Sequence, residues 1–310
     1  MAKRYTDMNC YLKAAFGCRV QKITVDAGMS CPNRDGTLSH RGCIFCNARG
    51  SGTGAHERGL SISEQLERGK KALFRRYKAK KFIAYFQSYT NTYAPLSRLR
   101  ALYDEALAVD DVVGLSIGTR PDCVDGPVLD LLESYAANRM IWMEFGLQSA
   151  ADDTLDRINR GHTAACFSEA VCAAQGRGLL VCAHVILGLP GEDRQKMMET
   201  ADFISRSGID GVKIHLLYVV RGTEMEHLYR KGDYRCLEQR EYVSLACEFL
   251  ERLPRAMVIQ RLTGDPHREE LAAPAWALDK AGTLAKIRAR LEEQDTWQGK
   301  KYKSTNQPTR

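Results

Sequence analysis

The sequence lacks the segments that carry a chain into or across a membrane. No apolar stretch precedes a cleavage site near the N-terminus, so a secretory leader is not expected. The longest apolar run, residues 179–190, is too short for a membrane span and contains His184. Repeats and low-complexity stretches are also missing. We therefore expect a soluble, cytoplasmic protein with no membrane partner, whose 310 residues suffice for one large core with an appendage.

The cysteines lack the even, regular pairing of a disulfide-stabilised secreted protein. There are 11 of them, scattered along the chain, which favours a reducing cytoplasm. One Cys-x-x-Cys pair occurs, formed by Cys43 and Cys46, and there is no second pair. A recognisable RNA-binding module is absent as well. The net charge of +7 permits attraction to phosphate backbones but does not by itself indicate nucleic-acid binding.

Between residues 20 and 220 the chain contains a regular alternation of short apolar runs and amphipathic stretches. The stretches have apolar residues at helical spacing, and one opens with Ser61 followed by Glu64, a capping box. The runs are rich in β-branched or apolar residues, and we expect six strands, at 22–27, 82–88, 112–119, 141–149, 179–187 and 212–220. This order predicts an α/β fold, a partial (β/α)6 TIM-like barrel.

The alternation ends after residue 221, and three parts are predicted. Residues 1–225 would form the partial barrel with an N-terminal lead-in. Residues 226–294 would form a C-terminal α/β extension that caps the barrel, with a helix at 238–252, a strand at 257–262 and a helix at 275–294. Residues 295–310 are polar and basic, so we expect a flexible tail, with RNA contact as an alternative role.

Strand periodicity places polar side chains inside the predicted barrel. Alternate residues of a strand share a face, so Glu144 and Gln148 lie opposite Phe145 and Leu147, which would pack on helices. Ordinary closed barrels fill their interior with branched apolar side chains. The interior set predicted here is Asp26, Gln87, Ser116, Arg120, Glu144, Gln148, His184, Lys213 and His215. The pattern predicts a cavity for a polar ligand, with helix capping or solvent exposure as the alternative for individual members.

The loop after the first predicted strand carries Cys31, Cys43 and Cys46, at the end of a barrel where active sites are built. Three thiolates on an iron–sulfur cluster leave one iron open to bind a substrate or cofactor. The same cysteines, with His40 or His56, would alternatively complete a tetrahedral zinc site. The residues alone therefore predict a metal centre and leave both metals open.

These cysteines, together with Gln148 and the Asn-Arg-Gly-His-Thr segment at 159–163, resemble the radical S-adenosylmethionine (SAM) superfamily. The resemblance covers nearly the whole chain and is strongest to the YhcC/YtqA (MnmL-like) branch, which is related to Elongator-like radical SAM domains. Further matching segments are 86–93, 117–122, 188–192 and 261–265. The resemblance implies a partial barrel of the radical SAM type, bound SAM and a [4Fe–4S] cluster on Cys31, Cys43 and Cys46.

The resemblance also implies contacts to SAM. Phe45 would pack beside the cluster and adenine, Gln148 would bind a ribose hydroxyl, and Arg160 would pair with the SAM carboxylate. The superfamily's Gly-Gly-Glu, which binds the SAM amino group, is replaced by Gln87-Ser88-Tyr89, and the gap between the first two cysteines is longer than usual. The expected cofactor-binding set is Phe45, Gln87, Ser88, Arg120, Gln148, Arg160 and Gly188.

The implied activity is reductive cleavage of SAM to a 5′-deoxyadenosyl radical, which abstracts hydrogen from a substrate. An external reductant of the flavodoxin or ferredoxin type would supply the electron. The YtqA side of the family is associated with modification of the wobble-uridine side chain of tRNA, so tRNA is the expected substrate. A small molecule or peptide is an alternative, as is a non-enzymatic, zinc-stabilised RNA-binding protein.

Four interior residues are the predicted catalytic set: Glu144, His184, Lys213 and His215. Their strand phase points them inward, where they would orient the substrate or move protons. Buried pairing with a purely structural role is the alternative for each.

Overall fold

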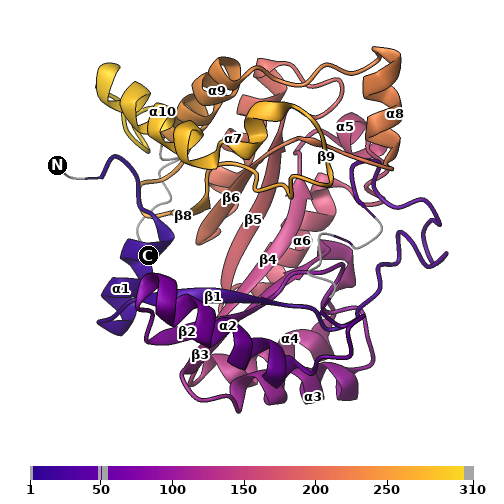
Figure 1. Cartoon of the computed structure of the whole chain (residues 1–310), viewed down its shortest axis with the longest axis vertical. Helices are drawn as coiled ribbons and strands as arrows, with labels where there is room; N and C mark the ends of the chain where they lie inside the picture. The colour runs from indigo at the N-terminus through magenta and orange to yellow at the C-terminus, as the bar shows by residue number, and fades with distance from the viewer. Residues whose placement is uncertain (1–2, 48–49, 51–54, 304–310) are drawn as a thin grey trace.

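The computed structural model describes residues 3–47, 50 and 55–303, and its centre is one curled β-sheet (Figure 1). Seven strands lie in the order β1-β2-β3-β4-β5-β6-β8, and every pairing between neighbours is parallel. The helices lie on the outside of the curl. This half-barrel with a C-terminal extension confirms the predicted α/β fold class.

The six strands predicted from the sequence all occur. They are β1 (Val20–Val25), β2 (Lys81–Phe86), β3 (Val112–Thr119), β4 (Met140–Gln148), β5 (Leu180–Leu187) and β6 (Gly211–Leu216). The sixth ends earlier than predicted, because the residues after it form β7 (Val219–Val220), which pairs antiparallel with β9 (Leu271–Ala273) in a separate small sheet.

Helices between the strands begin at side-chain caps. Ser61 accepts a hydrogen bond from the Glu64 backbone in the predicted capping box, and Asp125 and Asp193 cap two later helices in the same way. The connecting helices are α2 (Ile62–Tyr77), α3 (Leu96–Leu107), η1 (Pro121–Cys123), α4 (Gly126–Ala136), α5 (Asp152–Arg157), α6 (Ala164–Ala174) and α7 (Arg194–Arg206). In the described ranges, none of the helices has the length and apolarity needed to cross a bilayer.

A seventh strand, β8 (Val258–Arg261), joins the main sheet beside β6, although the sequence analysis assigned it to the cap. Val258 and Ile259 are both 2% exposed, so the strand is held by burial as well as by pairing. The helix α9 (Gln239–Arg252) precedes it and acts as one more βα crossover. The N-terminal lead-in reaches the same strand, since the Ile259 amide donates to the Thr6 carbonyl at 2.8 Å.

The C-terminal extension consists of α8 (Glu224–Lys231), α9, η2 (Ala275–Leu278) and α10 (Lys280–Glu293), and the lead-in contributes α1 (Met8–Phe16). The expected flexible tail is wrong for residues 295–303. Thr296 and Gln298 are 1% and 0% exposed. The Gln298 side chain donates to the Met257 carbonyl at 2.8 Å and accepts from the Thr6 amide at 2.9 Å. These hydrogen bonds allow polar residues of this segment to be buried. The rest of the predicted tail, residues 304–310, lies outside the described residues.

The strands separate an apolar outer layer from a polar interior. Phe145 and Leu147 are fully buried against the helices, as their strand phase predicted. At the amino ends of the strands, Trp142, Cys182 and Val258 close the interior, with the Tyr11 ring of α1 5.8 Å from the Trp142 ring. These side chains close the interior at the amino ends of the strands, so the cavity lies toward the carboxyl ends, where the loops lie.

Candidate active site

A cavity of about 450 Å³ contains the three predicted metal ligands. Cys31, Cys43 and Cys46 line it from the loop after β1. Most of the expected SAM contacts line the same cavity, namely Phe45, Gln87, Arg120, Gln148 and Arg160. The fold thus brings together residues that are far apart in the sequence and that were singled out separately.

Cys43 lies at the centre of a set of hydrogen-bond donors. The Arg160 Nη1 atom is 3.5 Å from its sulfur and the Asn33 Nδ2 atom is 3.6 Å away. The Gly146 carbonyl accepts from two nitrogens of Arg160, at 3.1 and 2.7 Å, and thereby fixes the plane of the guanidinium. Asn33 also donates to the Asn159 carbonyl at 2.6 Å, so it ties the cysteine loop to the Arg160 segment.

Gln148 ends β4 in a left-handed backbone conformation, with φ of 75°. Residues with a Cβ adopt this region rarely, and such positions concentrate at functional sites. The pairing with β5 is irregular just before it, between Phe145 and Gln148. The local distortion turns the Gln148 side chain to the cavity wall, where the resemblance expects a SAM contact.

The thiols fit an iron–sulfur cluster. Cys31, Cys43 and Cys46 are all free, and the donors beside Cys43 would stabilise its thiolate. Burial, and then the neighbouring Cys43, raise the pKa of Cys46 to about 11, so this thiol needs a bound cation to lose its proton at neutral pH. A [4Fe–4S] cluster held at these cysteines would provide that charge.

A single-ion site is not preassembled in the part of the chain that the structure describes. No three His, Cys, Asp or Glu side chains there converge on one point that suits a metal ion. The tetrahedral zinc alternative, which adds His40 or His56 to the cysteines, therefore has no geometric support in these residues. A cluster spreads its thiolate ligands over several metal atoms and does not require such convergence.

Arg120 is a positioning residue rather than a free cavity cation. It is 1% exposed, and its guanidinium forms a two-pronged ion pair with Asp122, at 2.8 and 2.7 Å. It also donates to the carbonyls of Arg160 and Gly161, at 2.7 and 3.2 Å. Arg120 therefore holds the backbone that carries Arg160.

Four predicted polar residues do not line the cavity. Ser116 and Lys213 lie behind its wall and contact Glu144, whereas Ser88 and Asp26 lie elsewhere. Ser88 is fully buried, and its hydroxyl has no hydrogen-bond partner among the described residues. Asp26 was expected in the interior, but its carboxylate accepts from the Gly28 amide at 3.2 Å in the turn after β1. The alternation of β1 stops before this position, so strand phase does not apply to it.

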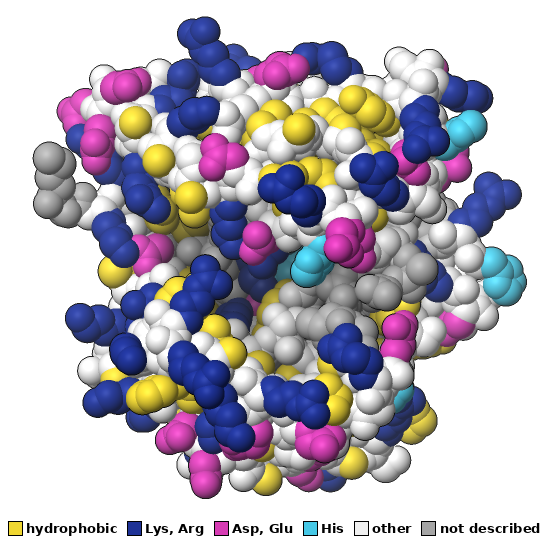
Figure 2. Space-filling view, viewed as in Figure 1, with side chains coloured by type: hydrophobic (Ala, Val, Ile, Leu, Met, Phe, Trp, Pro, Cys, Tyr) yellow, Lys and Arg dark blue, Asp and Glu magenta, His cyan; other side chains and the backbone are white. Residues whose placement is uncertain are grey.

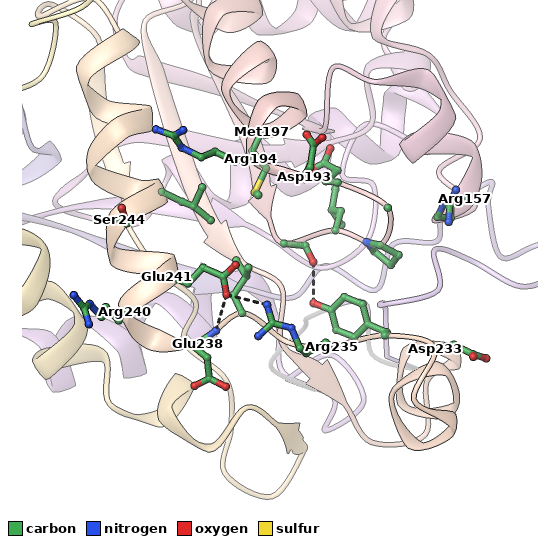
Figure 3. Close-up of a pocket in the computed structure, with 18 of the residues that line it drawn as sticks. Arg157, Asp193, Arg194, Met197, Asp233, Arg235, Glu238, Arg240, Glu241 and Ser244 are labelled. Atoms are coloured by element: carbon green, nitrogen blue, oxygen red, sulfur yellow. Dashed lines mark hydrogen bonds and ion pairs between the residues drawn. The ribbon is translucent and has the colours of Figure 1, made fainter.

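Gly188 lies in a different, larger cavity of about 760 Å³ (Figure 3). Its carbonyl accepts from the Tyr234 hydroxyl at 2.8 Å, and its left-handed φ of 89° turns the chain after β5. Arg235 and Glu241 form an ion pair at 3.3 Å elsewhere on the wall. The structure therefore does not bring Gly188 to the cysteines.

At the base of the cysteine cavity, Glu144 is the centre of a buried polar network. Its carboxylate is 0% exposed and pairs with Lys22 at 2.5 Å and with Lys213. His184 Nε2 lies 2.7 Å from Oε2, the oxygen that Lys213 also contacts, and the Ser116 hydroxyl donates to Oε1, the oxygen that Lys22 contacts. The pairing provides the partner charges that the sequence did not reveal.

The network sets unusual protonation states. Burial raises the pKa of Glu144, but Lys213 and Lys22 outweigh it and hold that pKa well below its usual value. Burial, partly offset by Glu144, lowers the pKa of Lys213 to about 7. Burial, followed by the charge of Lys213, lowers the pKa of His184 to about 4. The base of the cavity thus holds an ionised carboxylate and a neutral imidazole.

His215 also faces this network, with its ring 5.4 Å from that of His184. Its Nε2 atom is buried and has no hydrogen-bond partner among the described residues. Burial, and next Arg261, keep its pKa well below the usual value, so the ring is neutral. His215 lines the cavity together with Glu144 and His184. The fourth predicted catalytic residue, Lys213, reaches the same carboxylate but is not itself on the lining.

Sequence reasoning missed four members of this region: Lys22, Tyr85, Gln260 and Arg261. Lys22 lies on the same face of β1 as Thr24, which lines the cavity, so the alternation of side chains along β1 could have placed Lys22 in the interior. Tyr85 lies in β2, and its ring centre is 3.9 Å from Lys213 Nζ. Gln260, which accepts from Lys22 at 2.7 Å, was hidden by the assignment of its strand to the cap.

Two protein-family models match segments of this chain. "Radical SAM superfamily" matches residues 37–204, which include two of the three cysteines, Arg160 and the strands β2 to β5. "Radical_SAM C-terminal domain" matches residues 209–293, which begin just before β6.

Curated relatives match over nearly the full length. The uncharacterized protein YtqA of Bacillus subtilis is 43% identical over 298 residues, covering 96% of this chain and 92% of YtqA. Protein YhcC of Escherichia coli K12 is 39% identical over 283 residues, covering 91% and 90%. Among solved structures, the archaeal Methanocaldococcus infernus Elp3 with an N-terminal deletion is similar in fold, with a TM-score of 0.69 at 16% identity, covering 90% of this chain and 64% of that one.

Proposed function

Because the chain belongs to the radical SAM superfamily and is a radical SAM enzyme, we propose that it modifies the side chain of the wobble uridine of tRNA. A [4Fe–4S] cluster and SAM, when bound, supply the one-electron chemistry that removes a hydrogen atom from the substrate. The family implies both the cluster and SAM, and the hydrogen-bond donors beside the Cys43 sulfur suit a cluster ligand at this position. The observation that carries the tRNA proposal is a basic surface on α2.

The protein's own residues have three tasks in this proposal. Cys31, Cys43 and Cys46 hold the cluster. Arg160, already fixed by the Gly146 carbonyl and facing Cys43, pairs with the SAM carboxylate through its planar fork. The Glu144 network at the closed end of the cavity orients the substrate and excludes water from it.

The basic surface covers the second half of α2 and the turn after it. Its residues are Arg68, Lys70, Lys71, Arg75, Arg76, Lys78, Lys80 and Lys81, with no Asp or Glu among residues 68–81. Lys70 pairs with Glu67 at 2.9 Å. In the described part of the chain Lys71, Arg75 and Arg76 have no ion pair, although all three are exposed. Such a concentration of uncompensated charge is suited to a phosphate backbone.

Aromatic side chains lie within this basic surface. Phe74 is 54% exposed, and Lys78 lies 5.5 Å from its ring centre. Arg76 lies 5.0 Å from the ring centre of Tyr77. Exposed aromatics between cations are the combination that stacks on unpaired bases. In Figure 2, Lys and Arg side chains gather where Figure 1 has α1 and α2, and the same face is hollowed next to them.

We further propose a flavodoxin- or ferredoxin-type protein as electron donor and the cytoplasm as location. All 11 cysteines are free in the described residues, which supports a reducing compartment.

The binding test compares three charge reversals on α2, Lys71→Glu, Arg75→Glu and Arg76→Glu combined, with a matched triple variant elsewhere. Arg139, Lys231 and Arg288 are exposed, and their combined change to Glu alters the net charge equally. Filter binding of bulk tRNA at several salt concentrations should show at least a tenfold loss for the α2 variant and a shallower salt dependence. Equal binding by the two triple variants would contradict the role of α2.

The activity test uses tRNA from a strain that lacks the gene. The reconstituted enzyme, SAM and a reductant are added under anaerobic conditions, and the nucleosides are analysed by mass spectrometry. A mass change confined to the wobble uridine supports the proposal. Unchanged tRNA, with 5′-deoxyadenosine formed only when peptides or small metabolites are added, would replace tRNA by those substrates.

A further inference from the structure

Arg261 is a cavity arginine without a counter-ion. It ends β8, pairs in register with Lys213 and lines the cysteine cavity. It is half-buried, and within residues 3–47, 50 and 55–303 its guanidinium makes no hydrogen bond or ion pair. Arg120 and Arg160, in the same cavity, are held by Asp122 and by the Gly146 carbonyl. A partly buried guanidinium with no acceptor in the protein is able to bind an anionic ligand.

His215 provides a second unused group beside Arg261. Its buried Nε2 atom has no partner among the described residues, and after burial Arg261 is the strongest influence on its protonation. A neutral imidazole presents an N–H on one of its nitrogens, so His215 can donate to an anion that Arg261 attracts. The strands β6 and β8 are neighbours in the sheet, which brings the two side chains to one wall.

The charge balance of this wall favours an anion. Lys22 and Lys213 both pair with the buried carboxylate of Glu144, and Arg261 adds a third cation close to His215. Of the two other carboxylates on the lining, Asp265 pairs with Lys280 at 2.5 Å, and Glu270 accepts a hydrogen bond from the neutral Asn47 amide at 3.1 Å. With Lys213 protonated, the three cations of the described wall exceed the carboxylates of Glu144 and Glu270 by one charge.

We propose that Arg261 and His215 form a second anion-binding site in the cavity, which binds a carboxylate or phosphate group of the substrate. The assignment deepens the proposed function, since it takes the cavity as the place where substrate and SAM meet. Arg160 serves the SAM carboxylate beside the cysteines, and Arg261 serves a different anionic group on the β6–β8 wall. The substrate class is therefore one that carries a negative charge close to the atom that reacts.

The test uses small anions as probes and does not depend on tRNA. Thermal unfolding of the full-length, cluster-loaded protein is followed while chloride is replaced by acetate or phosphate at constant ionic strength. Anions also stabilise proteins non-specifically, so the informative quantity is the difference between variants. The wild type should gain about 2 °C more than Arg261→Met in at least one anion. Arg261→Lys should retain part of that gain, and Arg139→Met, an exposed arginine, should retain all of it.

A second arm separates the two sources of a carboxylate, SAM and substrate. Equilibrium dialysis with labelled SAM should show binding within twofold of wild type for Arg261→Met and at least tenfold weaker binding for Arg160→Met. A tenfold loss of SAM binding in Arg261→Met would overturn the proposal, because Arg261 would then belong to the SAM site. Equal anion gains in wild type and Arg261→Met would overturn it as well. Both arms leave the tRNA proposal untouched whichever way they turn out.

Discussion

The guanidinium of Arg160 lies 3.5 Å from the sulfur of Cys43, although 117 positions separate the two residues in the chain. Two side chains hold the backbone at this position, since Asn33 donates to the Asn159 carbonyl and Arg120 to the Arg160 carbonyl. If Cys43 ligates a cluster, as proposed, the guanidinium of Arg160 would lie beside that ligand and could pair with the SAM carboxylate. The position of Arg160 is fixed by hydrogen bonds within the protein.

Replacement of Cys43 by alanine should abolish cluster binding. The remaining two thiols supply too few ligands, so anaerobic reconstitution should give nearly no iron instead of about four atoms per chain. Iron analysis and the visible spectrum measure this. Cys172→Ala is the matched control, since Cys172 is exposed and away from the cavity lining. Full iron content in Cys43→Ala would remove this residue from the ligand set.

Glu144→Gln should destabilise the protein strongly. The amide keeps the shape but leaves Lys22 and Lys213 without a carboxylate in a buried site, which costs about 3–5 kcal/mol. Urea unfolding measures the loss. Glu133→Gln removes a carboxylate that is 47% exposed and paired with Arg177, and it should cost less than about 1 kcal/mol. Similar losses in the two variants would mean that the Glu144 network contributes little to stability.

His184 should make stability depend on pH in the weakly acidic range. Its pKa is about 4 in the folded state and about 6.5 when unfolded, so the unfolded state binds more protons between these values. The contribution is intact above pH 6.5 and is lost as the pH falls toward 4, with a slope of at most about 1.4 kcal/mol per pH unit.

His184→Gln should flatten this part of the profile, since glutamine can still donate to Glu144 and does not titrate. Urea unfolding at several pH values between 4 and 7 measures the slope. His227→Gln, at an exposed position on α8, should leave the profile unchanged. A slope in His184→Gln as steep as in wild type would assign the pH dependence to other groups.

Truncation should divide the C-terminal segment into two parts. Ending the chain after Glu293 removes Thr296, Gln298 and Lys301, so buried Glu251 loses two partners and the unfolding free energy should fall by at least about 2 kcal/mol. Ending it after Lys303 removes none of these contacts and should have no effect. Equal stability of the two truncated chains would show that the Gln298 contacts are not energetically important.

Much of the barrel was predictable because its signals are local. The Ser61–Glu64 capping box and the alternation through Glu144 depend on residues a few positions apart, and both occur as expected. The cysteine loop was predictable for the same reason. Motifs along one stretch of chain thus indicated the strands, the cavity and the proposed metal ligands.

What failed depended on contacts between distant segments. Gln298 is polar and lies in a basic segment, which suggests an exposed position. It is buried because its side chain donates to the carbonyls of Pro254 and Met257, which are distant in the sequence. Arg261 was read as part of a cap because nothing local shows that β8 pairs with β6. Gly188 was carried over with a matching motif, but the turn after β5 directs it to another cavity. The surroundings of these residues depend on contacts with distant segments, which a single sequence does not specify.

The bond between the Thr6 amide and the Gln298 side chain spans 292 positions, so it also fixes when the barrel can be completed. During synthesis the first strand leaves the ribosome long before β8 and Gln298, by roughly 15 to 60 s at ordinary translation rates. Throughout that interval Lys22 has no Gln260 to bind, and the lead-in has no strand to pair with. The nascent chain therefore carries its cysteine loop on an unfinished barrel until β8 and Gln298 have emerged.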